Sequence, residues 1–392
     1  MKKSLTLLAI LLTTCALHAA DENIQVSREV DSLGFTKPIP ISLSGFSGEV
    51  ASTLQFDLFF MGFKIVPVAE ARYQIQKNNA AGVGAQVTDP LQRKVVYNKA
   101  FTGGGPRQQT HALADDLAQA LTQKPGIAQT RLACKVQMTG YGAGEIVIAD
   151  YDGFGAQPVT KDGVICAAPA WAGRNQLFYM SHKRADKPDI LSHNLATGAR
   201  KTVARHQGMN SSPAISPDGK QMAMILSKAG SPDLWVSDLE GGNLRQLTTT
   251  KEDESSPCWS PDSRTICFVS RVSGKPALYT IPATGGTMQR LPTAGVANPT
   301  EPDWSPDGKY IIFTANMGGF QICVVPVEGP RRGTAEALVA GEDPVWAPNS
   351  RCVMFVRNVN NRRVLSLLDV PSKQFKDVVR ISGSASQPSW AR

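Results

Sequence analysis

The sequence predicts a mainly β protein, a six-bladed β-propeller preceded by a small α+β domain. Two observations carry this prediction: one motif recurs at a near-constant spacing, and alternating hydrophobic segments are separated by Gly-rich turns. The chain has 392 residues, which is long enough for two domains. Its 34 Gly and 26 Pro residues are typical of a protein with many turns.

The recurring motif is a turn of the form Pro-Xaa-Trp-Ser-Pro-Asp-Gly. Full-length copies stand at 213–219 (with Ile in place of Trp), 257–263 (with Ser in place of Gly) and 302–308, and weaker copies at 169–172, 344–349 and 388–391. Neighbouring copies are 42 to 45 residues apart, which is the length of one four-stranded propeller blade. In this turn Pro presets φ, Asp bonds the backbone two residues on, and Gly accepts a positive φ.

The sixth copy of the motif falls at the C-terminal end of the sequence, one strand into its blade. The other strands of that blade are expected at 131–137, 145–150 and 156–160. Residues 129–392 are therefore predicted to form a closed ring in which the C-terminal strand pairs with the strand that begins at Arg131. Such closure leaves only short, protected strand edges.

Residues 21–128 read as the α+β domain, with two helices on one sheet. One helix is expected to start at a Ser47 cap and to end at Gly62, and the other to run from Thr110 to Pro125. Strands are expected at 63–66, 73–76, 84–87 and 94–101. Residues 21–40 look extended and contribute nothing obvious to a core, and residues 125–126 read as a hinge.

Residues 1–20 read as a secretory signal peptide, with Lys2 and Lys3 before a short apolar run and small residues after it. A lipid anchor at Cys15 is the alternative. The run is too short to span a membrane, and no later segment is long and apolar enough. Removing the two lysines lowers the formal charge from +8 to +6, and the remaining charges are scattered, which argues against nucleic-acid binding.

Six cysteines follow the signal region, and none forms a Cys-Xaa-Xaa-Cys pair. Their irregular spacing favours single apolar positions on strands. Export nevertheless makes a disulfide possible, and Cys258 with Cys267 is the pair to test, because the two flank one predicted hairpin.

The sequence carries no recognisable catalytic or metal-binding pattern. There is no Gly-Xaa-Ser-Xaa-Gly elbow, and Ser47 reads as a helix cap. The histidines lack metal-ligand spacing on one element. Asp218, Asp262 and Asp307 recur inside the turn and the tryptophans recur with the blade, so both sets read as structural. We expect a non-catalytic binding protein without cofactor or metal, with a glycan- or small-ligand-binding propeller, or an enzyme that uses the channel, as alternatives.

Three segments resemble the TolB family of the Tol–Pal envelope system: 150–154, 300–307 and 388–390. The resemblance implies a monomeric periplasmic scaffold that maintains outer-membrane integrity and constriction at cell division. It implies the peptidoglycan-associated lipoprotein Pal as partner at one mouth of the propeller, and it leaves TolA open as a partner of the extended N-terminal segment.

The residues carried over by position lie where the chain enters each innermost strand, and Thr300 with Glu301 matches the Pal-contacting run best. The expected mouth residues are Asn210, Ser211, Ser255, Ser256, Thr300, Glu301, Glu342 and Asp343. In the N-terminal segment, Ile24 and Val26 alternate as in a peptide that adds a strand to a partner sheet.

Overall fold

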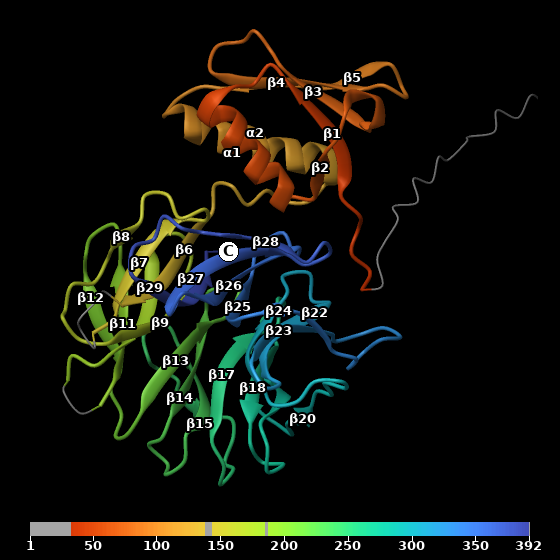
Figure 1. Cartoon of the computed structure of the whole chain (residues 1–392). Coiled ribbons are helices and arrows are strands. Elements are labelled where there is room, and N and C mark those ends of the chain that lie inside the picture. Colours follow the sequence, from red (N-terminus) through yellow and green to blue (C-terminus); the bar gives the residue numbers. More distant parts are fainter. Residues whose placement is uncertain (1–32, 138–142, 185–186, 392) are drawn as a thin grey trace, which may run out of the picture.

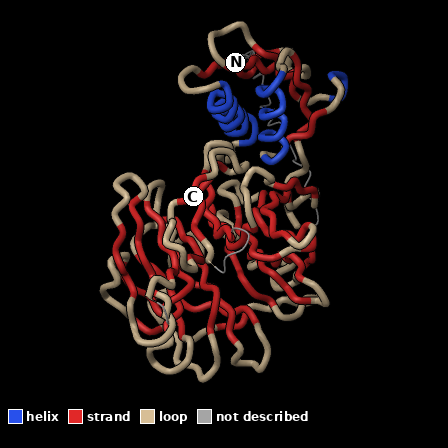
Figure 2. Tube along the Cα trace, turned by 60° about the vertical axis from the view of Figure 1, so that its left-hand side comes forward, coloured by secondary structure: helices blue, strands red, loops and turns tan. Residues whose placement is uncertain are grey.

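The computed structural model describes residues 33–137, 143–184 and 187–391. It has two parts: a helix-and-sheet domain above, and a ring of sheets below (Figure 1). A view from another side shows the same separation of the helices from the strands of the ring (Figure 2). The predicted signal peptide, Ile24 and Val26 lie outside the described residues.

The N-terminal domain is one five-stranded sheet with strand order β2-β1-β3-β4-β5. Both helices lie on the face of the sheet that is turned toward the propeller (Figure 1). The elements are β1 (Ile39–Ser44), α1 (Gly48–Phe60), β2 (Phe63–Ile65), a short 3-10 helix (Val68–Glu70), β3 (Tyr73–Lys77), β4 (Val83–Asp89), β5 (Lys94–Phe101) and α2 (Pro106–Thr122).

Three expectations for this domain are corrected. Residues 39–40 begin a strand rather than lying outside the core: β1 pairs in parallel with β2 and β3, and its Ile41 is fully buried. Helix α2 begins at Pro106 rather than Thr110, because Pro fits the first helical position, where no N–H is needed. Ser47 stands at the cap position of α1, but its side chain makes no capping hydrogen bond.

The propeller consists of six four-stranded sheets. The first blade holds β29 (Ser384–Trp390), β6 (Arg131–Gln137), β7 (Glu145–Asp150) and β8 (Gln157–Pro158), and the second β9 (Cys166–Trp171), β10 (Gln176–Ser181), β11 (Asp189–Asn194) and β12 (Arg200–Ala204). The third holds β13 (Asn210–Ile215), β14 (Gln221–Leu226), β15 (Asp233–Asp238) and β16 (Arg245–Gln246), and the fourth β17 (Glu254–Trp259), β18 (Thr265–Ser270), β19 (Ala277–Pro282) and β20 (Gln289–Arg290). The fifth holds β21 (Pro299–Trp304), β22 (Tyr310–Asn316), β23 (Phe320–Pro326) and β24 (Glu336–Ala340), and the sixth β25 (Glu342–Trp346), β26 (Cys352–Val359), β27 (Arg362–Asp369) and β28 (Gln374–Asp377).

The predicted closure of the ring is confirmed. Strand β29 pairs antiparallel with β6, with Ser384 opposite Gln137 and Trp390 opposite Leu132. The indole Nε1 of Trp390 also donates a hydrogen bond to Thr130 Oγ1 at 2.8 Å. The first blade thus takes its inner strand from one end of the propeller sequence and its other three strands from the opposite end.

The recurring aspartates are turn residues, as predicted. Ser216 Oγ donates to Asp218 Oδ1 at 2.6 Å, and the same Ser–Asp bond recurs at 260–262 and 305–307. The hydroxyl bond holds the pKa of Asp218 and of Asp262 below the usual value. The turn also joins blades, because the Asp218 N–H donates to Ser263 Oγ of the next blade at 3.0 Å.

Two of the recurring tryptophans also join blades. The Nε1 group of Trp171 donates to Ser389 O at 3.2 Å, and that of Trp259 donates to Ala214 O at 2.9 Å. In both cases the acceptor lies on the inner strand of the preceding blade, so these indoles pack between blades as the sequence predicted.

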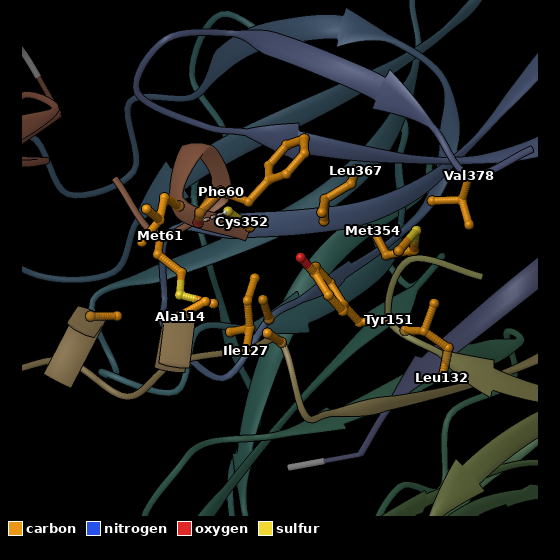
Figure 3. Close-up of a cluster of buried hydrophobic side chains, with 14 of the residues drawn as sticks. Phe60, Met61, Ala114, Ile127, Leu132, Tyr151, Cys352, Met354, Leu367 and Val378 are labelled. Carbon is orange, nitrogen blue, oxygen red and sulfur yellow. Dashed lines mark hydrogen bonds between the residues drawn. The ribbon is translucent and has the colours of Figure 1, made fainter. Parts of the chain in front are cut away.

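The two domains share one hydrophobic core. Figure 3 shows Phe60 and Met61 beside Cys352 and Met354 of the sixth blade, with Ile127 and Tyr151 below them. The backbone carbonyl of Phe60 accepts from Asn349 Nδ2 at 3.2 Å and from Cys352 Sγ at 2.8 Å. The junction is therefore a packed surface rather than an open linker.

The segment expected to act as a hinge lies in that packed surface. Ile127 and Ala128 are buried, and the N–H groups of Ala128 and Gln129 donate to the carboxylate of Asp115 at 2.7 and 3.1 Å. A Cβ at Gly126 would lie 2.4 Å from the Cα of Asp115, so α2 and this segment are in direct contact.

Residues 33–36 also contribute to a core, contrary to the expectation for residues 21–40. Phe35 packs against Tyr310 and Trp346 of the propeller, and Leu33 belongs to the same buried cluster. The Arg351 guanidinium, buried in an ion pair with Asp369, donates to Thr36 O at 2.9 Å. This segment thus runs along the propeller before it enters β1.

The cysteines read as buried strand residues. Cys258 and Cys267 are opposite partners on β17 and β18, as the hairpin predicted, and Cys267 has a free thiol in this structure. Burial raises the pKa of Cys134 and of Cys323 to about 12, so these thiols stay protonated and unreactive at neutral pH.

Candidate partner-binding site in the propeller channel

A cavity of about 360 Å³ lies on the axis of the propeller. The inner strands of all six blades line it, and it extends to Gly173 and Gly219 in the turns that follow β9 and β13. Its size is within the range of ligand pockets in proteins. The channel is therefore the first place to look for a binding site.

Each inner strand carries a β-bulge formed by one residue and a following proline. Proline is tolerated at a bulge because no ladder hydrogen bond is lost there. The residue before each proline has φ between 50° and 54°, a left-handed conformation that is uncommon for residues other than Gly. We call these six the ring residues: Ala168, Ser212, Ser256, Glu301, Asp343 and Gln387.

Side chains connect half of the ring from blade to blade. Glu301 Oε2 accepts from the Asp343 N–H at 3.0 Å, and Asp343 Oδ2 accepts from the Gln387 N–H at 2.9 Å. Gln387 Oε1 then accepts from the Ala168 N–H at 3.0 Å. The bulge therefore turns these three N–H groups toward the preceding blade, where a side-chain oxygen of the preceding ring residue accepts a hydrogen bond from each of them.

The connected half of the ring is acidic. Burial, and then the nearby Glu301 carboxylate, raise the pKa of Asp343 to about 8, so Asp343 is mostly protonated at pH 7. Glu301 accepts from Thr314 Oγ1 at 2.7 Å. Burial raises the pKa of Glu342, which ion-pairs with the half-exposed Arg363 at 3.0 Å.

A comparison with protein families decides the family. A family profile described as the TolB beta propeller domain matches residues 118–392, which is more than half of the chain. The chain belongs to the TolB family. The family assignment agrees with the resemblance seen in the sequence, and the profile covers the whole ring described above.

Curated and solved relatives agree with this family. The chain is 33% identical to the Tol-Pal system protein TolB of Haemophilus ducreyi over 34% of this chain and 32% of the relative. It is 27% identical to that of Alcanivorax borkumensis over 44% and 41%. The matched segments thus span about a third to two fifths of these relatives. The crystal structure of TolB from Acinetobacter baumannii has the same fold, with a TM-score of 0.79, 23% identity, and 93% of this chain and 98% of that one covered.

Three of the eight expected mouth residues, Ser256, Glu301 and Asp343, line the cavity of this TolB-family chain. The other five stand just before the ring residues. Ser255 is exposed, Ser211 is nearly buried, Thr300 bonds Thr314 O at 3.4 Å, and Glu342 pairs with Arg363. Asn210 is fully buried and holds its own loop, since its Nδ2 donates to His206 O and its Oδ1 accepts from the His206 N–H.

The expectation missed three ring residues: Ala168, Ser212 and Gln387. The signal that could have found them is positional, because each stands directly before the first proline of its motif copy. None of the three is acidic like Glu301 and Asp343, so a search for the same residue types passes over them.

Other chemistry was sought in the same residues. Among the residues described here, no group of three His, Cys, Asp or Glu side chains has the arrangement of a metal site. Within the described ranges, neither helix is long and apolar enough to cross a membrane. His111 Nδ1 lies 2.8 Å from Asp57 Oδ2, but both groups are buried in the domain junction and neither residue lines the channel.

Proposed function

We propose that this TolB-family protein is a non-catalytic periplasmic scaffold of the Tol–Pal system, acting in outer-membrane integrity and in constriction at cell division. The observation that supports the proposal is the channel itself: a cavity lined by six bulges, one from each blade of a TolB-family propeller. The curated relatives it matches are named as TolB proteins of the Tol-Pal system.

The partner proposed for the propeller is the peptidoglycan-associated lipoprotein Pal. Its binding surface would comprise the ring and the eight residues at and before it, with Glu301 at the centre because this side chain links two blades. TolA is a second partner, through the segment that contains Ile24 and Val26. Partner surfaces of this kind combine a few anchors with a polar rim.

Catalysis is not part of the proposal. Among the described residues, the one His–Asp pair with hydrogen-bond geometry is buried between the domains, and Tyr151 donates to the same Asp57. A general base must reach substrate, and these groups are covered by α1, α2 and the first blade. They serve packing instead.

The test is binding of the mature protein to Pal from the same organism, by calorimetry or biolayer interferometry. Glu301→Lys should weaken binding by at least about tenfold, because it reverses the charge at the ring and removes an acceptor. Glu301→Gln removes the charge but keeps the oxygen acceptor, so it distinguishes an effect of charge from an effect on folding. Glu240→Lys, at an exposed turn, is the matched charge-reversal control. Equal affinity of Glu301→Lys and wild type, with both folded, would refute this site.

A ligand other than a protein is the second candidate, because the cavity is large enough for a small molecule. Peptidoglycan fragments that raise the Tm of the wild type in a saturable way would favour it. The same fragments should then fail to act on Glu301→Lys.

A further inference from the structure

The ring in the channel is only half connected by its own side chains. The three hydrogen bonds described above join Glu301 with Asp343, Asp343 with Gln387, and Gln387 with Ala168. In each bond the side chain of one ring residue receives the N–H of the next ring residue around the axis.

In the other half the side chains are too short. By the same rule, the N–H of Ser212 would need an acceptor on the side chain of Ala168, and alanine has none. The N–H of Ser256 would need one on Ser212, and the N–H of Glu301 one on Ser256. Among the described residues, neither the Ser212 nor the Ser256 hydroxyl accepts a hydrogen bond from the next ring N–H. The N–H groups of Asp343, Gln387 and Ala168, in contrast, each donate to the side chain of the preceding ring residue. All six ring residues share one backbone conformation.

The same bulge geometry therefore turns the N–H groups of Ser212, Ser256 and Glu301 toward the cavity wall, where no side chain of the described residues accepts a hydrogen bond from them. All three residues line the cavity. A partner that displaces water from the cavity must bring an acceptor for these N–H groups, because leaving a buried N–H unpaired costs about as much free energy as a lost hydrogen bond.

We propose that a bound partner supplies this missing acceptor by inserting a side-chain carboxamide, from Asn or Gln, into the channel against Ser212, Ser256 and Glu301. The inference deepens the proposed function and rests on it, since it assumes that the channel receives a protein partner. Gln387 is the internal example of the arrangement: its carboxamide oxygen receives the N–H of Ala168.

Charge selects the carboxamide over a carboxylate. Glu301 and Asp303 line the same cavity, so a carboxylate from the partner would add like charge beside theirs. A carboxamide brings an oxygen acceptor for the N–H groups and an NH₂ donor for the acidic side of the channel, without adding charge.

The first test fills the open half from within the protein. Ala168→Gln and Ser212→Gln introduce glutamine at two positions in the unconnected half of the ring. Glutamine is the residue type that, at position 387, accepts a ring N–H. The double variant should keep or raise the wild-type Tm and should bind Pal on the order of tenfold more weakly, because the positions for the partner's acceptor are already taken. Ser273→Gln, at an exposed loop residue, is the matched control.

The second test reads the N–H groups directly. Hydrogen–deuterium exchange of the free protein should be faster at Ser212 and Ser256 than at Asp343 and Gln387, and bound Pal should slow it at the first pair. Pal binding that leaves exchange at Ser212 and Ser256 unchanged, together with full affinity of the double variant, overturns this inference and leaves the proposed function standing.

If wild-type protein does not bind Pal, the proposed function fails and short peptides decide the inference. The probes are acetyl-Ala-Asn-Ala-amide and its Asp and Ala counterparts. Selective protection of Ser212 and Ser256 by the Asn peptide supports a carboxamide site. Equal effects of the three peptides, or none, reject it.

Discussion

Tyr151 of the propeller donates its phenolic hydrogen to Asp57 of α1, a residue 94 positions earlier in the chain. The other oxygen of Asp57 is hydrogen-bonded to Nδ1 of His111 on α2. One fully buried carboxylate thus joins both helices to the first blade. The burial and the Asp57 charge raise the pKa of Tyr151 well above its usual value, which keeps the phenol a donor at every physiological pH.

Tyr151→Phe should therefore destabilise the protein. The substitution keeps the ring and removes the donor, so Asp57 Oδ1 is left as a buried acceptor. We expect a loss of about 1–3 kcal/mol in the free energy of unfolding, measured by urea denaturation. Tyr73→Phe, at a partly exposed strand position, is the control and should change little. A Tyr151→Phe protein as stable as the wild type would show that this bond contributes nothing.

Phe35→Ala should cost about 3 kcal/mol, because the ring is buried and stacks on Tyr310 with centroids 4.7 Å apart. The same substitution at the exposed Phe320 should cost less than about 0.5 kcal/mol. Limited proteolysis adds a readout of the segment itself, since its release should expose cleavage sites before β1. Identical stability of the two variants would contradict the packing described here.

Gly126→Ala tests whether the domain junction is packed or hinged. The new Cβ would lie 2.1 Å from Asp115 Oδ1 and 2.4 Å from the Asp115 Cα, so α2 must shift. We expect a loss of about 1–3 kcal/mol. Gly319→Ala, where a Cβ meets nothing within 4 Å, is the control. An open hinge would tolerate both substitutions equally.

Asp343→Asn should change how stability depends on pH. The folded pKa of about 8 is above the unfolded value, so the contribution of protonated Asp343 is complete at acid pH and is lost as pH rises toward 8. Asparagine cannot ionise, so it does not lose this contribution. The Tm of the variant minus the Tm of the wild type should therefore be at least about 3 °C larger at pH 8 than at pH 5. Asp253→Asn, at an exposed position, should show no such gain. Parallel pH curves for Asp343→Asn and wild type would rule out a raised pKa.

The repeat made the propeller predictable from sequence. A turn that recurs every 42 to 45 residues fixes the blade length, and the incomplete sixth unit requires closure across the ring, as β29 with β6 confirms. The turn aspartates were predictable for the same reason, because the groups that donate to them lie two residues away on either side.

Other features depend on partners that no local pattern reveals. Leu33 O receives the Tyr310 hydroxyl from 277 residues further along, so nothing near Leu33 marks it as a core residue. The start of α2 was hidden by the glycines before Pro106. The connected half of the ring was equally hidden, since Asp343 and Gln387 are neighbours only after the blades have closed.

Closure by β29 also sets an order of events in folding. Trp390 reaches Thr130 across 260 residues, so the first blade is completed only when β29 has joined β6. Until then β6 presents an unpaired edge, and contacts of such long range form slowly. We therefore expect the first blade to close last, and its open edge to be the part of an unfinished chain most exposed to aggregation.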